Sequence, residues 1–142
     1  MLKVTPVSQH LRRIDFSLDT KKLFEKQSIK ADLPKVRSSI NTSYRDFEND
    51  VYEVSVNVLC ESEEEDFFNI SCEYSGIFKI EDYKNEESLE VIVAGYCTGF
   101  VFPFIRAKIA SITMEAGLQS IMLEPVDFYA LHKKQKSEEV KS

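Results

Sequence analysis

The sequence predicts an α+β fold, in which a four-stranded antiparallel sheet is covered on one face by a long helix and a short C-terminal helix. The first observation is an alternation of apolar and polar residues with period two, which recurs before residue 81. The second is a spacing of three and four between apolar residues from about residue 99 onward. The 142 residues, 43% of them hydrophobic and 30% charged, fit one domain over residues 1–142. Its folded core is expected over residues 5–134 and a charged tail over residues 135–142.

Four segments in the first half of the chain are predicted to be strands. Residues 11–18 alternate between apolar and polar side chains, and residues 35–42 do so weakly. The clearest strand is 51–59, and the alternation returns in 67–80. Only the short acidic segment 61–66 separates these last two strands, so they are predicted to form a hairpin.

A long amphipathic helix is predicted over residues 99–116. Gly117 supplies a helix stop, and Pro103 is compatible with the helix only if it lies in the first turn, where no backbone donor is lost. Residues 89–96 are either a short helix or an extended piece, because a short apolar run has no decisive period. The apolar positions that define the long helix include Phe102, Ile105, Ile109 and Ile112.

A loop over residues 118–126 is expected to lead into a short helix at 127–134, because the side chain of Asp127 can cap its first turn. The most apolar stretch, residues 91–105, is about 15 residues long where a membrane span needs roughly 20. It also contains glycine and proline, so we expect a buried segment and no membrane insertion. The first residues carry no secretion signal, which predicts a cytoplasmic protein.

Composition and motifs argue against several classes of function. The net charge of −6 gives no reason to expect nucleic-acid binding. Cys60, Cys72 and Cys97 lack the spacing of a zinc site or a disulfide framework, and we interpret them as reduced thiols. His10 and His132 are isolated and no nucleophile motif is present. We therefore expect no catalytic residues, no metal site and no cofactor.

Apolar residues occur instead in two segments that are expected to be loops. The first is the connection at residues 19–34, and the second is the loop at 118–126. Exposed apolar groups often mark an interface, and methionine suits a surface that accepts varied partners. The alternative is that the loops fold back and complete the core. The residues concerned are Leu23, Phe24, Ile29 and Leu33 in the first segment and Ile121, Met122 and Leu123 in the second.

The whole chain resembles the SecB family of protein-export chaperones. Four segments carry the resemblance in the same order, at residues 49–54, 75–80, 95–106 and 123–131. The third reads Gly-Tyr-Cys-Thr-Gly-Phe-Val-Phe-Pro-Phe-Ile-Arg, and the fourth reads Leu-Glu-Pro-Val-Asp-Phe-Tyr-Ala-Leu. The resemblance implies a crossover connection between the first two strands and an assembly that is a dimer of dimers.

The resemblance also implies a function, which is to hold unfolded or non-native polypeptides in apolar grooves without ATP. The groove residues carried over by position are those of the two apolar segments, together with Phe128 and Leu131 of the short helix. The long helices would pack between dimers, and the residues expected at that interface are Phe102, Ile105, Ile109 and Ile112.

One departure from the family concerns the motor protein SecA. Export chaperones of this family meet SecA through acidic positions on the outward sheet face, where this chain has Arg13, Ser17, Asn69 and Ser71. Attraction to a basic partner would be weakened by this change. The departure favours a dedicated chaperone, such as the members that guard an antitoxin, over general export.

Two other classes of function stay open at the level of sequence. A small-molecule binder or enzyme of the same fold class would need an enclosed cavity with converging polar groups. A structural oligomerisation module would bury Phe24 and Met122 at contacts between subunits.

Overall fold

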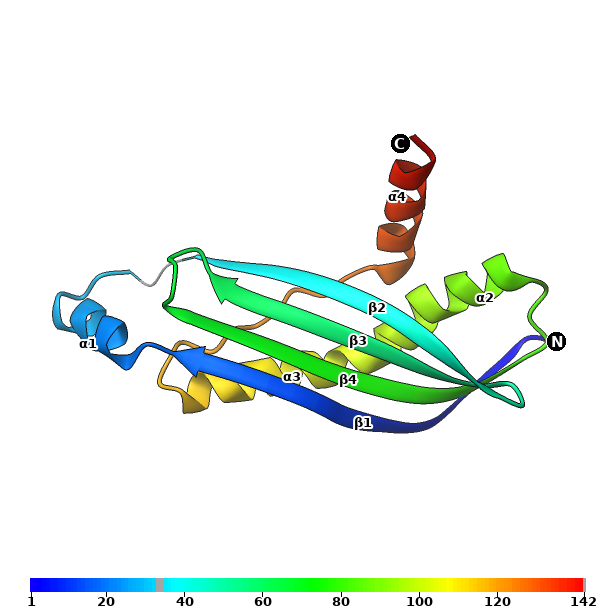
Figure 1. Ribbon diagram of the computed structural model, residues 1–142, viewed down its shortest axis with the longest axis horizontal. Coiled ribbons are helices and arrows are strands. Elements are labelled where there is room, and N and C mark those ends of the chain that lie inside the picture. Colours follow the sequence, from blue (N-terminus) through cyan, green and yellow to red (C-terminus); the bar gives the residue numbers. More distant parts are fainter. Residues whose placement is uncertain (33–34, 142) are drawn as a thin grey trace.

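The computed structural model describes residues 1–32 and 35–141, with side chains through residue 136. It contains one antiparallel sheet with the strand order β1-β4-β3-β2, so the first two strands occupy opposite edges and the chain crosses the end of the sheet between them (Figure 1). This arrangement confirms the predicted fold class and the crossover. The strands are β1 (Lys3–Leu18), β2 (Val36–Glu48), β3 (Val51–Ser62) and β4 (Phe68–Glu81).

The first strand and the crossover differ from the expectation. β1 begins at Lys3 rather than near residue 11, because pairing with β4 continues across two irregularities in register. The crossover contains a helix, α1 (Thr20–Ser28), where we expected an irregular connection. Asp19 caps it by accepting a hydrogen bond from the Lys22 amide at 3.1 Å. None of the nine residues of α1 is buried, so it has no continuous apolar face that the sequence could reveal.

The β3–β4 hairpin forms the centre of the core, as predicted. Alternate residues of β3 are fully buried on the face that carries the helices, and Val58 pairs there with Cys72 of β4. The edge strand β2 buries none of its residues, which explains its weak alternation. The alternating side chains of β3 that form the core are Tyr52, Val54, Val56, Val58 and Cys60.

The helical part of the core is longer than predicted. It runs as α2 (Glu86–Ile92), a π-helical turn η1 (Val93–Cys97) and α3 (Thr98–Glu115), so the ambiguous segment 89–96 is helical. Pro103 is the sixth residue of α3 and not a first-turn residue. An interior proline costs about 3 kcal/mol. Burying one large apolar side chain contributes roughly 1.5–3 kcal/mol, and α3 buries several against the sheet. α3 ends at Glu115, and Gly117 supplies the predicted stop with φ of +81°.

The helical stretch Glu86–Glu115 has the length and hydropathy of a membrane span, a property that the core helix of a soluble protein shares. Half of its most apolar window is buried inside this fold, where α3 lies behind β3 and β4 (Figure 1). The fold therefore buries half of this window, while Val91, Tyr96 and Phe104 stay exposed.

The last helix, α4 (Phe128–Lys141), projects away from the sheet (Figure 1). Asp127 caps it by accepting a hydrogen bond from the Ala130 amide at 3.0 Å, as predicted. The helix continues past Lys134 through most of the segment expected to be a tail. Its first turn joins the core, where the ring of Phe128 packs edge-on against Phe102 at 5.2 Å.

The three cysteines are buried and free, and their burial gives a first testable prediction. Burial raises the pKa of Cys60 and Cys72 to about 11 and that of Cys97 to about 12, from an ordinary value of 9.0. We expect a thiol reagent at pH 8 to label the folded protein far more slowly than the urea-unfolded protein. Ionisation of the thiols lowers the free energy of unfolding only above about pH 9. Between about pH 9 and pH 11 the unfolded state loses these protons while the folded state keeps them. Equal labelling rates for folded and unfolded protein would contradict the prediction.

Candidate functional site

The structure brings the two apolar segments together at one end of the molecule. α1, the β3–β4 loop and the C-terminal end of α3 lie at that end (Figure 1). There Phe67, Phe68 and Leu118 form a small buried cluster, and Leu23 of α1 and Ile121 of the loop after α3 pack against it. Residues almost a hundred positions apart in the sequence therefore share one surface.

A hollow of about 350 Å³ lies between the crossover and the loop that links α3 to α4. We call it the crossover hollow. Its floor is apolar and its rim carries a carboxylate, an amide and a hydroxyl. Leu33, which was expected in this groove, lies outside the residues that the structure describes. The lining residues are Asp32, Val36, Phe68, Leu118, Gln119, Ser120 and Ile121.

A second hollow, of about 260 Å³, lies between the edge strand β2 and α4. We call it the helix hollow. Ile40, Val93, Phe128 and Leu131 give it apolar walls, while β2 and the outer turns of α4 supply polar side chains around them. Leu131 thus lines a hollow, as expected of a groove residue. The other lining residues are Asn41, Thr42, Ser43, Tyr44, Glu90, Ala94, His132 and Gln135.

The expected groove residues divide into an exposed group and a supporting group. Phe24, Ile29 and Met122 are 68%, 76% and 67% exposed, so they are available to a partner. Leu23, Ile121 and Leu123 are half-buried and pack against the core. Phe128, also expected in a groove, is only 6% exposed and forms part of the wall of the helix hollow.

The linking loop is fastened to α3 by hydrogen bonds that present Met122 outward. The Arg106 Nε donates to the carbonyl of Leu123 at 2.7 Å, and the amide of Ile121 donates to Thr113 Oγ1 at 3.0 Å. Ser120 Oγ adds a bond to the carbonyl of Ala110 at 3.0 Å. Residues on both sides of Met122 are held, so its side chain stays at the surface.

Sequence reasoning missed the anchoring residues Thr113 and Ser120 and the whole contribution of β2. A hydroxyl within an apolar helix was the available signal for Thr113, whose oxygen is fully buried and accepts the loop amide. Tyr44 of β2 donates to Glu86 Oε1 at 3.3 Å across the end of the helix hollow. The pKa of Tyr44 is raised, mainly by burial and secondly by the charge of Glu86. Its hydroxyl therefore stays protonated and neutral.

The residues expected at an oligomer interface need correction. Phe102, Ile105 and Ile109 are buried in the core of the single chain, where they pack against the sheet. Ile112 is half-buried against the same core. The period of an amphipathic helix identifies an apolar face but not its partner, and here the partner is the sheet of the same chain. α3 also has a second apolar surface, where Phe104 stacks on Tyr74 at a ring distance of 6.1 Å beside a shallow hollow.

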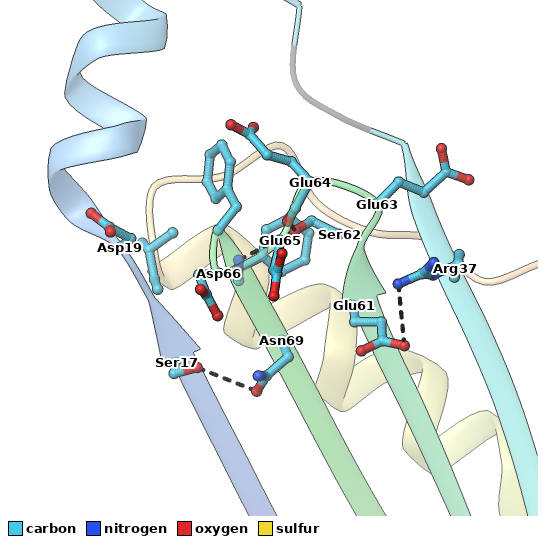
Figure 2. A pocket seen from close by; sticks show the side chains of 13 residues that line it. Ser17, Asp19, Arg37, Glu61, Ser62, Glu63, Glu64, Glu65, Asp66 and Asn69 are labelled. Atoms are coloured by element: carbon cyan, nitrogen blue, oxygen red, sulfur yellow. Dashed lines mark hydrogen bonds and ion pairs between the residues drawn. The ribbon is translucent and has the colours of Figure 1, made fainter.

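The outward face of the sheet is neutralised by local pairing rather than acidic. Arg12 lies 3.8 Å from both Glu53 and Glu73, and Arg45 lies 3.0 Å from Glu53. Ser17 donates to Asn69 Oδ1 at 3.3 Å, at two of the positions that distinguish this chain from export chaperones. Excess negative charge gathers instead at the end of this face, in a pocket of about 680 Å³ under the β3–β4 loop (Figure 2).

The acidic pocket does not have the character of a metal centre. Figure 2 shows its carboxylates diverging, with Glu63 directed to one side and Glu64 to the other. Across residues 1–32 and 35–141, no three or more His, Cys, Asp or Glu side chains converge closely enough to hold a metal ion. Arg37 supplies a cation at its rim, 3.6 Å from Glu61.

Fold and site together define a small α+β protein that presents apolar side chains around surface hollows formed by loops, an edge strand and helix ends. Comparison with known proteins agrees with this class. A family model described as "Preprotein translocase subunit SecB" matches residues 8–139. The chain belongs to the SecB family, as its resemblance implied.

The relatives in this family are export proteins. The chain is 37% identical over 93 residues to the protein-export protein SecB of Rickettsia africae (strain ESF-5) and 34% identical over 93 residues to that of Rickettsia bellii (strain OSU 85-389). Each match covers 64% of this chain and 60% of the relative, so the matched segment spans less than two thirds of those proteins.

A solved structure supports the fold. It is described as the Mycobacterium tuberculosis Rv1957 SecB-like chaperone in complex with a ChAD peptide from the Rv1956 HigA1 antitoxin. The two chains superpose with a TM-score of 0.68 and 15% identity, over 87% of each chain. At this identity the likeness concerns the fold.

Proposed function

We propose that this protein is a cytoplasmic, ATP-independent chaperone that binds non-native polypeptides and carries out no chemical reaction. The observation that carries the proposal is the exposure of the apolar side chains Phe24, Ile29 and Met122 on the crossover and the linking loop, the two segments that border the crossover hollow. An unfolded client offers the matching chemistry, because its apolar side chains are still in water.

The energetics suit a protein that holds clients and then releases them. Fully burying one large apolar side chain contributes roughly 1.5–3 kcal/mol, so a single contact gives weak binding. Hollows at both ends of the linking loop would allow several weak contacts along one chain, which raises the overall affinity without any tight site. ATP is unnecessary for release, since each contact is individually reversible.

We propose that the protein works as a dimer of dimers. Two surfaces support this assembly. β1 is an edge strand with one unpaired side along its 16 residues, and unpaired strand edges favour pairing with another chain. The second is the outer surface of α3 around Phe104, which carries aromatic and small side chains. These replace Phe102, Ile105 and Ile109 as interface candidates.

Within this function, a dedicated role is favoured over general export. Recognition of a basic motor such as SecA would need net negative charge on the outward sheet face. Glu53 and Glu73 already pair with arginines of the same chain there, so less charge is available to a partner. A dedicated client such as an antitoxin does not require that charge. The role is proposed by analogy with the mycobacterial chaperone of similar fold.

The experiment is a test of aggregation suppression. The purified protein is added without nucleotide to a chemically unfolded client that is diluted into buffer, and light scattering follows aggregation. We expect suppression at ratios close to one oligomer per client, and binding of the unfolded but not of the folded client. If a folded oligomer fails to suppress aggregation of several unrelated clients and of any antitoxin encoded beside its gene, the chaperone function is excluded. A purely structural module would give this negative result.

A further inference from the structure

The crossover helix α1 has an unusual position, because it carries exposed client-binding residues but has little apolar contact of its own. It is nine residues long and none of its residues is buried. Isolated helices shorter than about 12–15 residues are marginal in water. Leu23 contributes one half-buried contact to the cluster of Phe67, Phe68 and Leu118. Other interactions must therefore hold α1 in place beyond the end of the sheet (Figure 1).

Two lysines of α1 provide these interactions by binding the β3–β4 loop. The ammonium of Lys26 lies 2.8 Å from Glu64 Oε2, and the ammonium of Lys22 donates to the carbonyl of Glu65 at 2.9 Å. Figure 2 shows Glu64 extending from this loop towards α1, away from the other carboxylates of the acidic pocket. Next to the helix, the amide of Asp19 donates to the carbonyl of Phe67 at 2.8 Å.

The pair of Lys26 and Glu64 differs from an ordinary surface ion pair. The Lys26 side chain is only 22% exposed, and its ammonium lies over the ring of Phe67 at 5.6 Å from the ring centre. The Glu64 side chain as a whole is 39% exposed, but its Oε2 atom, which faces Lys26, is buried from solvent, so the ammonium compensates the charge there. Removing one partner leaves the other charge partly desolvated, which costs more than losing an exposed pair.

We propose that Lys22, Lys26 and Glu64 form a latch that positions the crossover helix, and thereby fixes where Phe24 and Ile29 meet a client. This inference rests on the proposed chaperone function. While the latch is closed, Phe24 and Ile29 stay outward at fixed positions on the crossover. When it breaks, α1 loses its docking and its fold, and the two side chains lose their fixed position.

The test combines single substitutions, a double variant with the two charges reversed, and control substitutions at neighbouring positions. K26Q and E64Q each break the pair, and the double variant K26E/E64K restores it with the charges reversed. K21Q and E63Q serve as controls, since both residues are exposed, Lys21 is adjacent to Lys22 and Glu63 is adjacent to Glu64 in the sequence. The first readout is hydrogen exchange of the α1 amides. The second is the dissociation constant for an unfolded client labelled with a fluorophore.

We expect exchange in α1 to become at least about fivefold faster in K26Q and E64Q, with β3 and β4 unchanged. Client binding should weaken about threefold to tenfold in the same variants. The double variant should recover most of both effects, and the controls should match the native protein. Raising salt in the native protein should speed exchange in α1 more than in β3, because the pair is partly exposed.

Three results would overturn the latch. The first is unchanged α1 exchange in both K26Q and E64Q, and the second is faster exchange with an unchanged client dissociation constant. If the double variant stays as weak as the singles, the effect belongs to separate residues and the pair is not a latch. If the native protein binds no client, the chaperone function fails, while the exchange data still report on the docking of α1.

Discussion

Replacing Phe24 and Met122 together with serine is expected to weaken client binding by roughly tenfold to a hundredfold and to leave the fold unchanged. Both side chains are more than 60% exposed, so the native structure loses little when they are shortened. Each contributes up to about 1.5–3 kcal/mol when a client buries it completely, and partial burial reduces this gain. The measurement is the dissociation constant for an unfolded client, with thermal unfolding followed in parallel.

The matched control for this variant is M114S. Met114 is 64% exposed, like Met122, but it lies on α3, outside the crossover and the linking loop that carry Phe24 and Met122. We expect M114S to bind clients like the native protein. Light scattering tests the alternative function, a structural oligomerisation module. Such a module buries Phe24 and Met122 between subunits, so the assembly formed by F24S/M122S would have a lower mass. Unaltered client affinity with an intact assembly would remove both residues from the client site.

Substitution of Gly95 by alanine is expected to detach α4 and to abolish the helix hollow. Gly95 lies in the π-helical turn η1, and a Cβ atom there would overlap the aromatic ring of Tyr129 in the first turn of α4. The backbone of η1 and this ring are in contact only because the residue has no side chain. Overpacking of this kind costs typically 1–3 kcal/mol, and undocking α4 relieves it. Trypsin cleavage after Lys133 or Lys134 should become much faster in G95A.

The control is G99A, one turn further along the same helical stretch. A Cβ at Gly99 would lie 3.9 Å from Phe128 Cδ2, which is an ordinary contact distance. Alanine is favoured over glycine in a helix by up to about 1 kcal/mol, so G99A should be neutral or slightly stabilising. Equal cleavage rates in G95A and G99A would show that Gly95 is not required for the docking of α4. The client affinity of G95A then tests how much the helix hollow contributes.

The two central strands and the long helix could be predicted because each of them has one buried face and one face nearer to solvent. The alternation of residues 51–59 reflects a strand with one face fully buried, and Gly117 stops α3 because the backbone there has positive φ. The helix α1 could not be predicted in the same way. With no buried face, its residues carry no period, and its position depends on contacts between Lys26 and a loop almost forty residues away.

The candidate site was predicted in part. Apolar residues in polar surroundings identified both loops, and the structure places Phe24, Ile29 and Met122 at the surface. The sequence pattern did not distinguish contact residues from supports such as Leu123, since both are apolar residues in a loop. It also assigned Ile105 and Ile109 to an oligomer interface, whereas the sheet of the same chain covers them.

By itself, the sequence determined the fold class, the order of the elements and the family, because apolar periodicity and four ordered segments are local properties of a chain. Only the tertiary structure decided which apolar face of α3 belongs to the core and which loop residues are free to bind. It also revealed the contacts of Lys22 and Lys26 with the β3–β4 loop, on which the proposed latch rests. Burial and ion pairing arise between residues distant in sequence, and their partners exist only once the chain has folded.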